Sequence, residues 1–518
     1  MTMTNLSKKQ VVLIMVGLMF GILLASLDST IVGTAMPKII EALKGFDYYT
    51  WPVISYLLCI TISMPLFGKL ADIYGYKKIY VIGVVIFLAG SVLCGMSQNM
   101  IQLICFRGVQ GIGGAVLISN TMAIIGVLFS PAERAKYMGF MGSAGALASI
   151  IGPTLGGYIT DNLSWRWIFY VNVPVGIITL VIALFSLPEH EEGEAKKNID
   201  FLGAAALIVS LIPMLLAFTW AGNKYDWSSV QIISMLVFSA IMLVIFGLIE
   251  RKAEDPIIPL SLFKNSIFNI SAIEMFLVNA VMMGASIFLP LFVQAVVGKS
   301  ASKAGAIMTP MMLSLLVSAA VSGGVISKTQ KYKIQSWIGY VITGIGAVMF
   351  SFLNESSSNS EIIMDMIVLG IGMGIVIPIL STAAQNAFSE KQMGVVTSGI
   401  QFFKLLGSTI ASAVFGTVLN SSMKNGLESV KVDNLPTNIT VILKNPSTIS
   451  NPTVIQGIKA KLPKELLPIF GKMMEQIKHV LSNSIHDVFI ICVGISVISL
   501  VSGFFLREIP LAKASKKI

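Results

Sequence analysis

Charged and metal-binding side chains are scarce in this sequence. Only 12% of the 518 residues are Asp, Glu, Lys or Arg, against about a quarter in soluble globular proteins. The three histidines and four cysteines lack the spacing of a zinc site or a disulfide framework. The sequence contains neither a His-Glu-x-x-His motif nor a nucleotide-binding Gly-x-x-x-x-Gly-Lys-Ser/Thr loop. These absences speak against an enzyme, against ATP drive and against any cofactor.

Long apolar runs take the place of the missing charge. Hydrophobic residues make up 55% of the chain and the mean hydropathy is +0.83, so we expect an all-α polytopic membrane protein, because lipid offers no partners for free backbone groups. The first run carries Asp28 and has no cleavage site after a short core, so it predicts a membrane helix and not a signal peptide. Fourteen runs are long enough to span a bilayer: 11–36, 50–70, 78–97, 100–129, 134–160, 165–187, 200–220, 229–250, 268–297, 303–327, 334–353, 361–386, 395–420 and 485–507.

The positions of the basic residues predict the orientation. A net charge of +10 could suggest a nucleic-acid partner, but most Lys and Arg residues fall in alternate connecting segments, as the positive-inside rule describes. This pattern predicts that both termini are cytoplasmic, that membrane lipids surround the chain, and that no nucleic acid binds. It also places a long segment, about 421–484, outside. The second part of that segment, from Leu466, has amphipathic spacing and predicts a short helical cap.

One predicted helix, 134–160, carries a stripe of small residues. Gly145, Gly152 and Gly156 fall on one face, where a neighbouring helix can approach the backbone closely. Pro153 adds a local kink beside this face. Ordinary small-residue packing would explain the stripe, but the string Gly152-Pro153-x-x-Gly156-Gly157 is more specific than that.

This string resembles the signature of proton-driven antiporters in the major facilitator superfamily. Three further motifs support the resemblance to its 14-span drug:proton antiporters, including quaternary-ammonium and multidrug efflux pumps. They are the first-helix motif Leu27-Asp28-Ser-Thr-Ile-Val-Gly-Thr-Ala-Met-Pro37, the loop Gly68-Lys-Leu-Ala-Asp72-Ile-Tyr-Gly75-Tyr-Lys-Lys78, and the fourth-helix motif Arg107-Gly-Val-Gln-Gly-Ile-Gly-Gly114. The resemblance implies a monomer in the bacterial cell membrane. It also implies export of lipophilic compounds, with cations as the expected class, in exchange for protons.

An internal repeat agrees with this family fold. The segment 68–78 aligns without a gap to 324–334, and Gly83 then meets Gly339. Parallel six-helix repeats with a substrate site between them are the arrangement of major facilitators. We therefore expect a six-helix half at 1–190, a linker and an inserted helix pair at 191–265, and a second half at 266–518.

Charges inside the membrane need a reason, because each costs several kcal/mol, ~2.5–3.5 on insertion scales. Asp28 and Arg107 have similar predicted depths, so Arg107 could hold Asp28 ionised until a cation or a proton competes, or the two could form a purely structural pair. Glu274 lies two turns into its helix and is either a proton carrier or a residue facing the cytoplasmic vestibule. Asp365 is a second carboxylate candidate. Lys404 either extends to the cytosol or pairs with Glu274.

The resemblance also implies a conformational latch. Asp72, in a turn bounded by Gly68 and Gly75, would lie near the start of a helix in the other half, with Arg134 as a partner. The second copy has Lys328 at the position of Asp72, so the latch should be one-sided.

Two other functions fit parts of the pattern. One is a dedicated exporter of an endogenous metabolite, peptide or lipid, or an importer, although the antiporter signature weighs against import. The other is a sensor or intramembrane enzyme. Five side chains could line a soft, adaptable cavity or could simply pack: Met283, Phe288, Phe292, Phe402 and Phe403.

Overall fold

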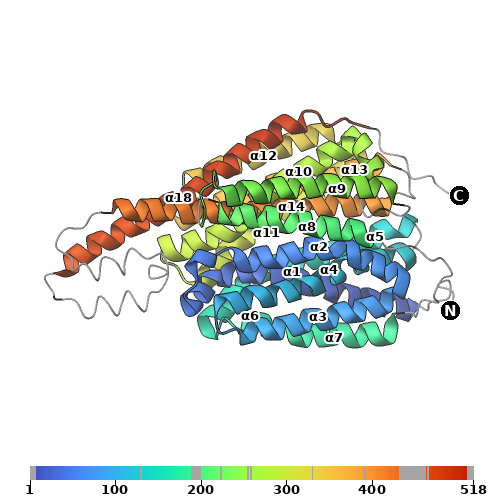
Figure 1. The fold of residues 1–518 in the computed structure, drawn as a ribbon, viewed down its shortest axis with the longest axis horizontal. Helices are drawn as coiled ribbons and strands as arrows, with labels where there is room; N and C mark the ends of the chain where they lie inside the picture. Colours follow the sequence, from blue (N-terminus) through green and yellow to red (C-terminus); the bar gives the residue numbers. More distant parts are fainter. Residues whose placement is uncertain are drawn as a thin grey trace.

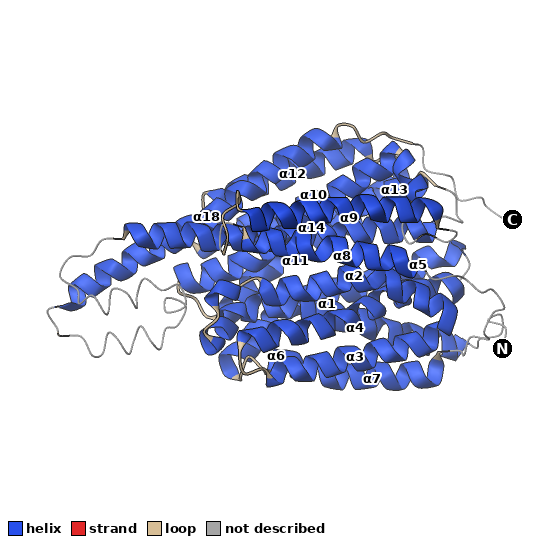
Figure 2. Cartoon of the chain, viewed as in Figure 1, coloured by secondary structure: helices blue, strands red, loops and turns tan. Residues whose placement is uncertain are grey.

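The computed structural model describes residues 8–509, with gaps at 129–130, 188–199, 222–223, 254–255, 257–258, 330, 389–392, 431–462 and 464–465. Within these ranges the chain is helical (Figure 2), and the bridge between Ala221 and Tyr225 is the one β-contact. The all-α prediction is therefore confirmed for the described residues. The α-helices are α1 (Lys8–Leu43), α2 (Trp51–Tyr74), α3 (Tyr76–Met96), α4 (Met100–Leu128), α5 (Pro131–Asn162), α6 (Trp167–Tyr170), α7 (Asn172–Ser186), α8 (Phe201–Trp220), α9 (Val230–Lys252), α10 (Ser266–Leu291), α11 (Ala301–Thr329), α12 (Lys333–Ser351), α13 (Asn359–Asn386), α14 (Met393–Ser429) and α18 (Leu467–Gly503).

Each predicted apolar run coincides with one of these helices or with two consecutive ones. Eleven of the helices are long and apolar enough to cross a membrane, and α2 and α8 contain shorter apolar stretches, Trp51–Met64 and Leu202–Phe218. The fourteen-span topology stays a prediction. Helix α1 also continues through Pro37 to Leu43, because a proline near the end of a long helix bends it without ending it.

A helix begins at Leu467, where the amphipathic spacing predicts one, but it is not the short cap that we expected. Helix α18 is one unbroken helix of 37 residues, because its only proline lies in the first turn and a buried apolar stripe continues along it. Met473, Ile477, Leu481 and Ile485 form this stripe. The projecting part packs against α14, where Gly426 approaches the Val480 side chain. The segment from Leu467 therefore extends the last membrane helix.

The helices lie side by side along the long axis of the molecule (Figure 1). Helix α1 begins and α18 ends at the same end of the bundle, which we call the termini end. The opposite end, where α14 and α18 project, is the loop end. We call α1–α7 the N-terminal helix group and α10–α18 the C-terminal helix group. They meet through α5 with α11 and through α2 with α14, while α8 and α9 pack on each other and α8 packs on α14 and α2.

The same glycine contact recurs in the two helix groups. Gly113 of α4 approaches α3 so closely that an added Cβ would lie 2.4 Å from the backbone nitrogen of Phe87. Gly372 of α13 approaches α12 in the same way, with 2.4 Å to the backbone nitrogen of Thr343. A side chain at either glycine would separate the paired helices. The repeat in the sequence is therefore accompanied by a repeated packing contact.

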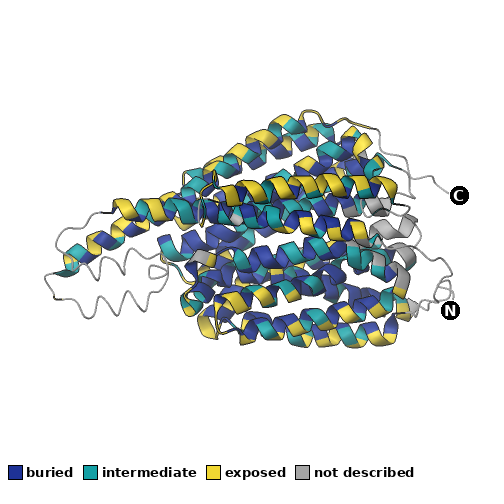
Figure 3. Ribbon diagram, in the orientation of Figure 1, coloured by how far each residue is buried: buried dark blue, intermediate teal, exposed yellow. Residues whose placement is uncertain are grey.

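Apolar residues lie on the outer surface of the bundle as well as in its core. Figure 3 shows exposed faces along the peripheral helices. In the most apolar stretch of α9, only 17% of the residues are buried. Large exposed side chains on these faces include Phe185, Val230, Val244 and Phe352. An apolar outer surface of this extent is the surface that a lipid bilayer covers.

Candidate functional site

Asp28 lies at the centre of a buried polar cluster between α1, α3, α4 and α7. Its Oδ2 accepts a hydrogen bond from Arg107 Nη1 at 2.5 Å, and its Oδ1 accepts from Gln110 Nε2 at 2.7 Å and from Asn172 Nδ2 at 3.0 Å. The Ser91 hydroxyl accepts from the same two amides at 2.7 and 3.3 Å. We call these five residues the Asp28 cluster.

The guanidinium group of Arg107 is buried and contacts residues of several helices. Its side chain is 1% exposed, and Nε donates to the carbonyl of Pro52 at 3.3 Å. The Tyr56 ring lies 4.0 Å from the guanidinium carbon, within cation–π range. Such a pair is stable inside a protein only because further hydrogen bonds complete it. In this conformation the surrounding helices enclose Asp28 completely.

The sequence predicted the depth of Asp28 and Arg107, and the structure brings the two together. Sequence reasoning missed Asn172 and Ser91, although each is a polar residue within an apolar run. Gln110 belongs to the fourth-helix motif, but its role as a partner of Asp28 was not predicted. Whether the cluster couples transport or only stabilises the fold stays a prediction.

Glu274 of α10 is the second fully buried carboxylate, and it faces a different set of helices. Its Oε2 accepts from the Ser499 hydroxyl at 2.5 Å, and its Oε1 contacts the Ser502 hydroxyl, both on α18. Tyr340 of α12 lies beside the same carboxyl group. No cation pairs with Glu274 among the described residues. Its environment is therefore made of hydroxyl groups.

Lys404 does not pair with Glu274, so this one of its two predicted alternatives is wrong. The two residues lie at similar heights, because Gly407 of α14 packs against the backbone of Phe276 in α10. Glu274, however, points away toward α18. Lys404 is partly buried and has no hydrogen-bond or ion-pair partner for its ammonium group in the described part of the chain. Asp365 is 5% exposed on α13 and likewise has no such partner there.

The glycine string of α5 packs against helices from both groups. Gly152 and Gly156 approach Thr30 and Ile31 of α1, where an added Cβ would lie 2.1 and 2.7 Å from side-chain and backbone oxygens. Gly157 faces α11 instead, with 2.3 Å from an added Cβ to the carbonyl oxygen of Ala301. The string therefore packs α5 against α1 of the N-terminal helix group through Gly152 and Gly156. Through Gly157 it packs α5 against α11 of the C-terminal helix group.

The α5–α11 contact continues in both directions. Gly305 of α11 packs on the backbone of Pro153, and the hydroxyl groups of Thr154 and Thr309 are 2.7 Å apart. Gly145 is less crowded, with its nearest neighbour, the Ser26 hydroxyl, at 3.5 Å from an added Cβ. The predicted small-residue face thus serves close helix packing from Gly152 onward.

Asp161 lies at the end of the α5–α11 contact, at the start of α11. Sequence reasoning did not predict its role. Its carboxylate accepts hydrogen bonds from the backbone N–H groups of Ala301 and Ser302, the first residues of α11, at 3.2 and 2.7 Å. A carboxylate at this position satisfies orphan donors and faces the positive end of the helix. A carboxylate directly after a close-packing string was the available signal.

The predicted latch is only partly described. Gly75 has a φ of +89°, which glycine adopts without strain, and it separates α2 from α3. Nothing lies within 4 Å of an added Cβ at Gly68. The side chains of Asp72 and Arg134 lie outside the described residues, so their contact stays a prediction.

The proposed cavity aromatics pack instead. Phe288 and Phe292 are buried, and Phe288 lies between Tyr49 and Phe415, with ring centroids 6.1 and 6.3 Å away. Phe402 and Phe403 contact each other near α8 and α9. Packing is therefore the reading that the structure favours for these rings.

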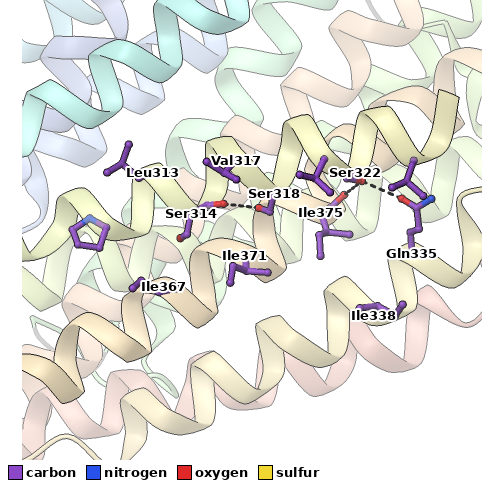
Figure 4. A pocket seen from close by; sticks show the side chains of 13 residues that line it. Leu313, Ser314, Val317, Ser318, Ser322, Gln335, Ile338, Ile367, Ile371 and Ile375 are labelled. Carbon is purple, nitrogen blue, oxygen red and sulfur yellow. Dashed lines mark hydrogen bonds between the residues drawn. The ribbon is translucent and has the colours of Figure 1, made fainter. Parts of the chain in front are cut away.

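A groove of about 690 Å³ lies between α11, α12 and α13 (Figure 4). Its serines are occupied: Ser314 and Ser318 donate to carbonyl groups of their own helix at 2.9 and 2.7 Å. Val317 and Val321 at its rim are more than half exposed. The groove is thus apolar and open on the outer surface of the bundle, and none of the buried carboxylates lines it.

Comparisons with known proteins agree on one family. The sequence profile of the Major Facilitator Superfamily matches residues 18–412. The chain is 38% identical over 515 residues to the multidrug transporter protein MdtP of Bacillus subtilis, covering 96% of this chain and 94% of that protein. It is 37% identical over 414 residues to multidrug resistance protein 3 of the same organism, covering 80% of each.

Solved structures show the same fold at low identity. A bacterial homologue of the human lysosomal transporter Spinster, in an inward-facing and unoccupied conformation, superposes with a TM-score of 0.67 at 16% identity, over 97% of this chain and all of that one. A D-xylose–proton symporter gives a TM-score of 0.61 at 12% identity, over 97% of this chain and 99% of that one. The helical bundle, the profile match and these relatives together show that the chain is a membrane transporter of the Major Facilitator Superfamily.

Proposed function

We propose that this transporter exports lipophilic compounds, with cations as the expected class, in exchange for protons by alternating access. The observation that carries the proposal is the contrast between two buried carboxylates. Asp28 is balanced by Arg107, whereas Glu274 has hydroxyl partners only. A buried carboxylate without a cation is costly when charged, so Glu274 can exchange a proton at a modest free-energy difference.

The proposed topology follows from the charge pattern. Two six-helix halves, with α8 and α9 inserted between them, cross the cell membrane of a bacterium with both termini in the cytoplasm. The asymmetry of Lys and Arg supports this orientation, and the Bacillus subtilis relatives support the bacterial membrane. The protein acts as a monomer, and its substrates are small lipophilic molecules, as the names of its multidrug relatives suggest.

In this orientation the described conformation is closed toward the outside. Contacts between the helix groups gather near the loop end: Tyr49 donates to the carbonyl of Ile287 at 3.2 Å, and Gln294 donates to that of Thr34 at 3.0 Å. The Asp161 contact with α11 lies there too. Alternating access then requires these contacts to open while Asp72 and Arg134 form a latch at the termini end.

Asp28, Arg107 and Asp365 keep secondary roles in this proposal. The Asp28 cluster holds α1, α4 and α7 together and changes its partners only in a state where the helices part. Asp365 adds a negative charge near the loop end of α13. Both carboxylates serve as second sites for a substrate cation, and Glu274 is the coupling site.

The test uses everted membrane vesicles that contain an acid-quenched dye. Quaternary ammonium compounds and neutral lipophilic compounds are added to wild type, Glu274→Gln, Asp28→Asn and, as a control, Glu361→Gln, which removes an exposed helix-capping carboxylate. We expect cationic compounds to release protons with wild type and Glu361→Gln but not with Glu274→Gln.

Other outcomes lead to other conclusions. If Asp28→Asn abolishes proton release and Glu274→Gln does not, coupling resides at Asp28. If no compound releases protons from properly inserted wild type, the multidrug proposal fails in favour of a dedicated exporter of an endogenous metabolite, peptide or lipid.

A further inference from the structure

The direction of the hydrogen bond between the carboxyl group of Glu274 and the hydroxyl group of Ser502 depends on whether Glu274 is protonated. The Ser502 oxygen contacts Glu274 Oε1 and lies 2.8 Å from the carbonyl oxygen of Ile498, one turn earlier in α18. A serine hydroxyl has one hydrogen to donate and can accept as well. Ser502 therefore cannot donate to Ile498 and to Glu274 at the same time.

Because Ser502 has one hydrogen to donate, the two protonation states of Glu274 have different hydrogen bonds. When Ser502 donates to Ile498, Glu274 Oε1 carries a hydrogen and donates it to the Ser502 oxygen. When Glu274 is ionised, the Ser502 hydrogen turns to Glu274 and the Ile498 carbonyl loses its side-chain donor. Ser499 donates to Glu274 Oε2 in both states, since no other hydrogen bond of its hydroxyl is found in the described part of the chain.

The positions of the two serines differ in access. Ser499 is 4% exposed, and Glu274 is fully buried. Ser502 is partly exposed and lies in the last turn of α18, which ends at Gly503 at the termini end. No charged residue other than Glu274 contacts this group among the described residues. Ser502 is thus the polar side chain between the buried carboxyl group and that end of the bundle.

We infer that Ser502 carries the proton of Glu274 to and from the termini end, with Ser499 as a positioning residue; the inference rests on the proposed proton coupling. On release, the Oε1–H bond of Glu274 breaks and an O–H bond forms on the Ser502 oxygen. The original Ser502 hydrogen leaves its hydrogen bond to the Ile498 carbonyl and passes to a water molecule at the termini end, which becomes hydronium. Glu274 is left ionised and accepts from the Ser502 hydroxyl. Uptake is the reverse.

The test compares side chains of equal shape. Ser502→Thr keeps a hydroxyl group, and Ser502→Val replaces it with a methyl group of nearly the same volume. Ser496→Ala is the control on the same helix, because within the described ranges the Ser496 hydroxyl bonds only to the carbonyl of Cys492, at 2.8 Å. Purified variants in proteoliposomes are measured with a quaternary ammonium compound that wild type transports, in two assays: its uptake driven by an imposed proton gradient, and its gradient-free counterflow.

We expect Ser502→Val to slow gradient-driven uptake on the order of tenfold or more, as the loss of a positioned proton-transfer group does, with counterflow within about twofold of wild type. Ser502→Thr and Ser496→Ala should drive uptake like wild type. Gradient-driven uptake by Ser502→Val equal to that of Ser502→Thr overturns the inference. Equal loss of both assays in Ser502→Val, with Ser502→Thr intact, also overturns it, because the hydroxyl then serves structure.

The proposed function fails separately. If wild type shows counterflow but no gradient-driven uptake, proton coupling itself is absent, whatever the serine variants do. If Glu274→Gln retains gradient-driven uptake while Ser502→Val loses it, coupling exists but the proton does not come from Glu274.

Discussion

The carboxylate of Asp161, in the last turn of α5, accepts a hydrogen bond of 2.7 Å from the backbone N–H of Ser302 in the first turn of α11. A residue of the N-terminal helix group thus caps a helix of the C-terminal group. The two groups cannot separate at the loop end without exposing the first N–H groups of α11. Asp161 therefore stabilises the conformation that is closed at this end.

Asp161→Asn should shift the equilibrium toward opening at the loop end. The carboxylate at a helix N-terminus contributes ~0.3–1 kcal/mol when exposed, so the open fraction should rise by up to about fivefold. Electron–electron distances between spin labels at Gln98 and Phe352 measure this opening. Asn162→Ala is the control, because the Asn162 amide bonds to its own helix at Tyr158. An unchanged distance distribution in Asp161→Asn would show that the cap contributes nothing to closure.

The Asp161 cap should persist across the physiological pH range. Burial raises the pKa of this carboxyl group, but hydrogen bonds from Ser302, Ser300 and Ala301 outweigh it and hold the pKa below the usual value of 3.8. The stabilisation is therefore complete above pH ~4 and is lost as pH falls through the lower pKa of the closed state. The spin-label distances should not change between pH 6 and 8. A transition in that range that disappears in Asp161→Asn would contradict this assignment.

Adding one methyl group to the α5–α11 contact should prevent closure. An added Cβ at Gly305 would lie 2.0 Å from the backbone oxygen of Pro153, and backbone cannot move aside as a flexible side chain can. Overpacking costs ~1–3 kcal/mol, so Gly305→Ala should reduce the closed population on the order of tenfold. Gly323→Ala, on the same helix with nothing within 4 Å, is the matched control. Equal behaviour of the two variants in the spin-label assay would refute the contact.

Removing Arg107 alone should harm the protein more than removing both members of its ion pair. Arg107→Gln leaves Asp28 buried without a cation, and breaking a buried pair costs about 3–5 kcal/mol. Arg107→Gln/Asp28→Asn removes the uncompensated charge and should recover part of this loss. Thermal unfolding in detergent, measured for both single variants and the double variant, gives the coupling. Additive losses would mean that the two side chains do not stabilise each other.

Lys404→Met should leave stability unchanged or raise it. The Lys404 ammonium group has no partner in the described ranges, and desolvating an unpaired charge is unfavourable, whereas methionine fills similar space. Lys299→Met, outside the helices, provides the control for loss of one positive charge. A fall in unfolding temperature for Lys404→Met beyond that of the control would indicate an anionic partner of Lys404.

The sequence predicts depth along a helix better than direction around it. Runs of about twenty apolar residues predicted the helices. Small residues spaced three or four apart predicted the face of α5 that packs closely on its neighbours from Gly152 onward. Asp28 and Arg107 were predicted at one level, and they meet. Glu274 and Lys404 also lie at one level, but they face different neighbours, because the direction of a side chain depends on how α10 and α14 are rotated against each other.

Contacts between distant segments were the least predictable. Asn172 and Ser91 complete the Asp28 cluster only because α3 and α7 close around α1. A polar residue within an apolar run does not by itself tell which helix it faces. Ser499 and Ser502 looked like ordinary small polar residues of a final membrane helix. Helix α18 was predicted too short, because polar residues such as Glu475 and Lys478 interrupt the apolar run without interrupting the helix.

The length of α18 makes it a lever. Its 37 residues extend about 55 Å at helical rise, nearly twice the ~30 Å of a bilayer core, and the end that contacts Glu274 is the one farthest from the projecting tip. A rotation of about 5° around the Glu274 end would move the tip by about 5 Å. A change of angle at the Glu274 end would therefore appear as a larger displacement at the far surface.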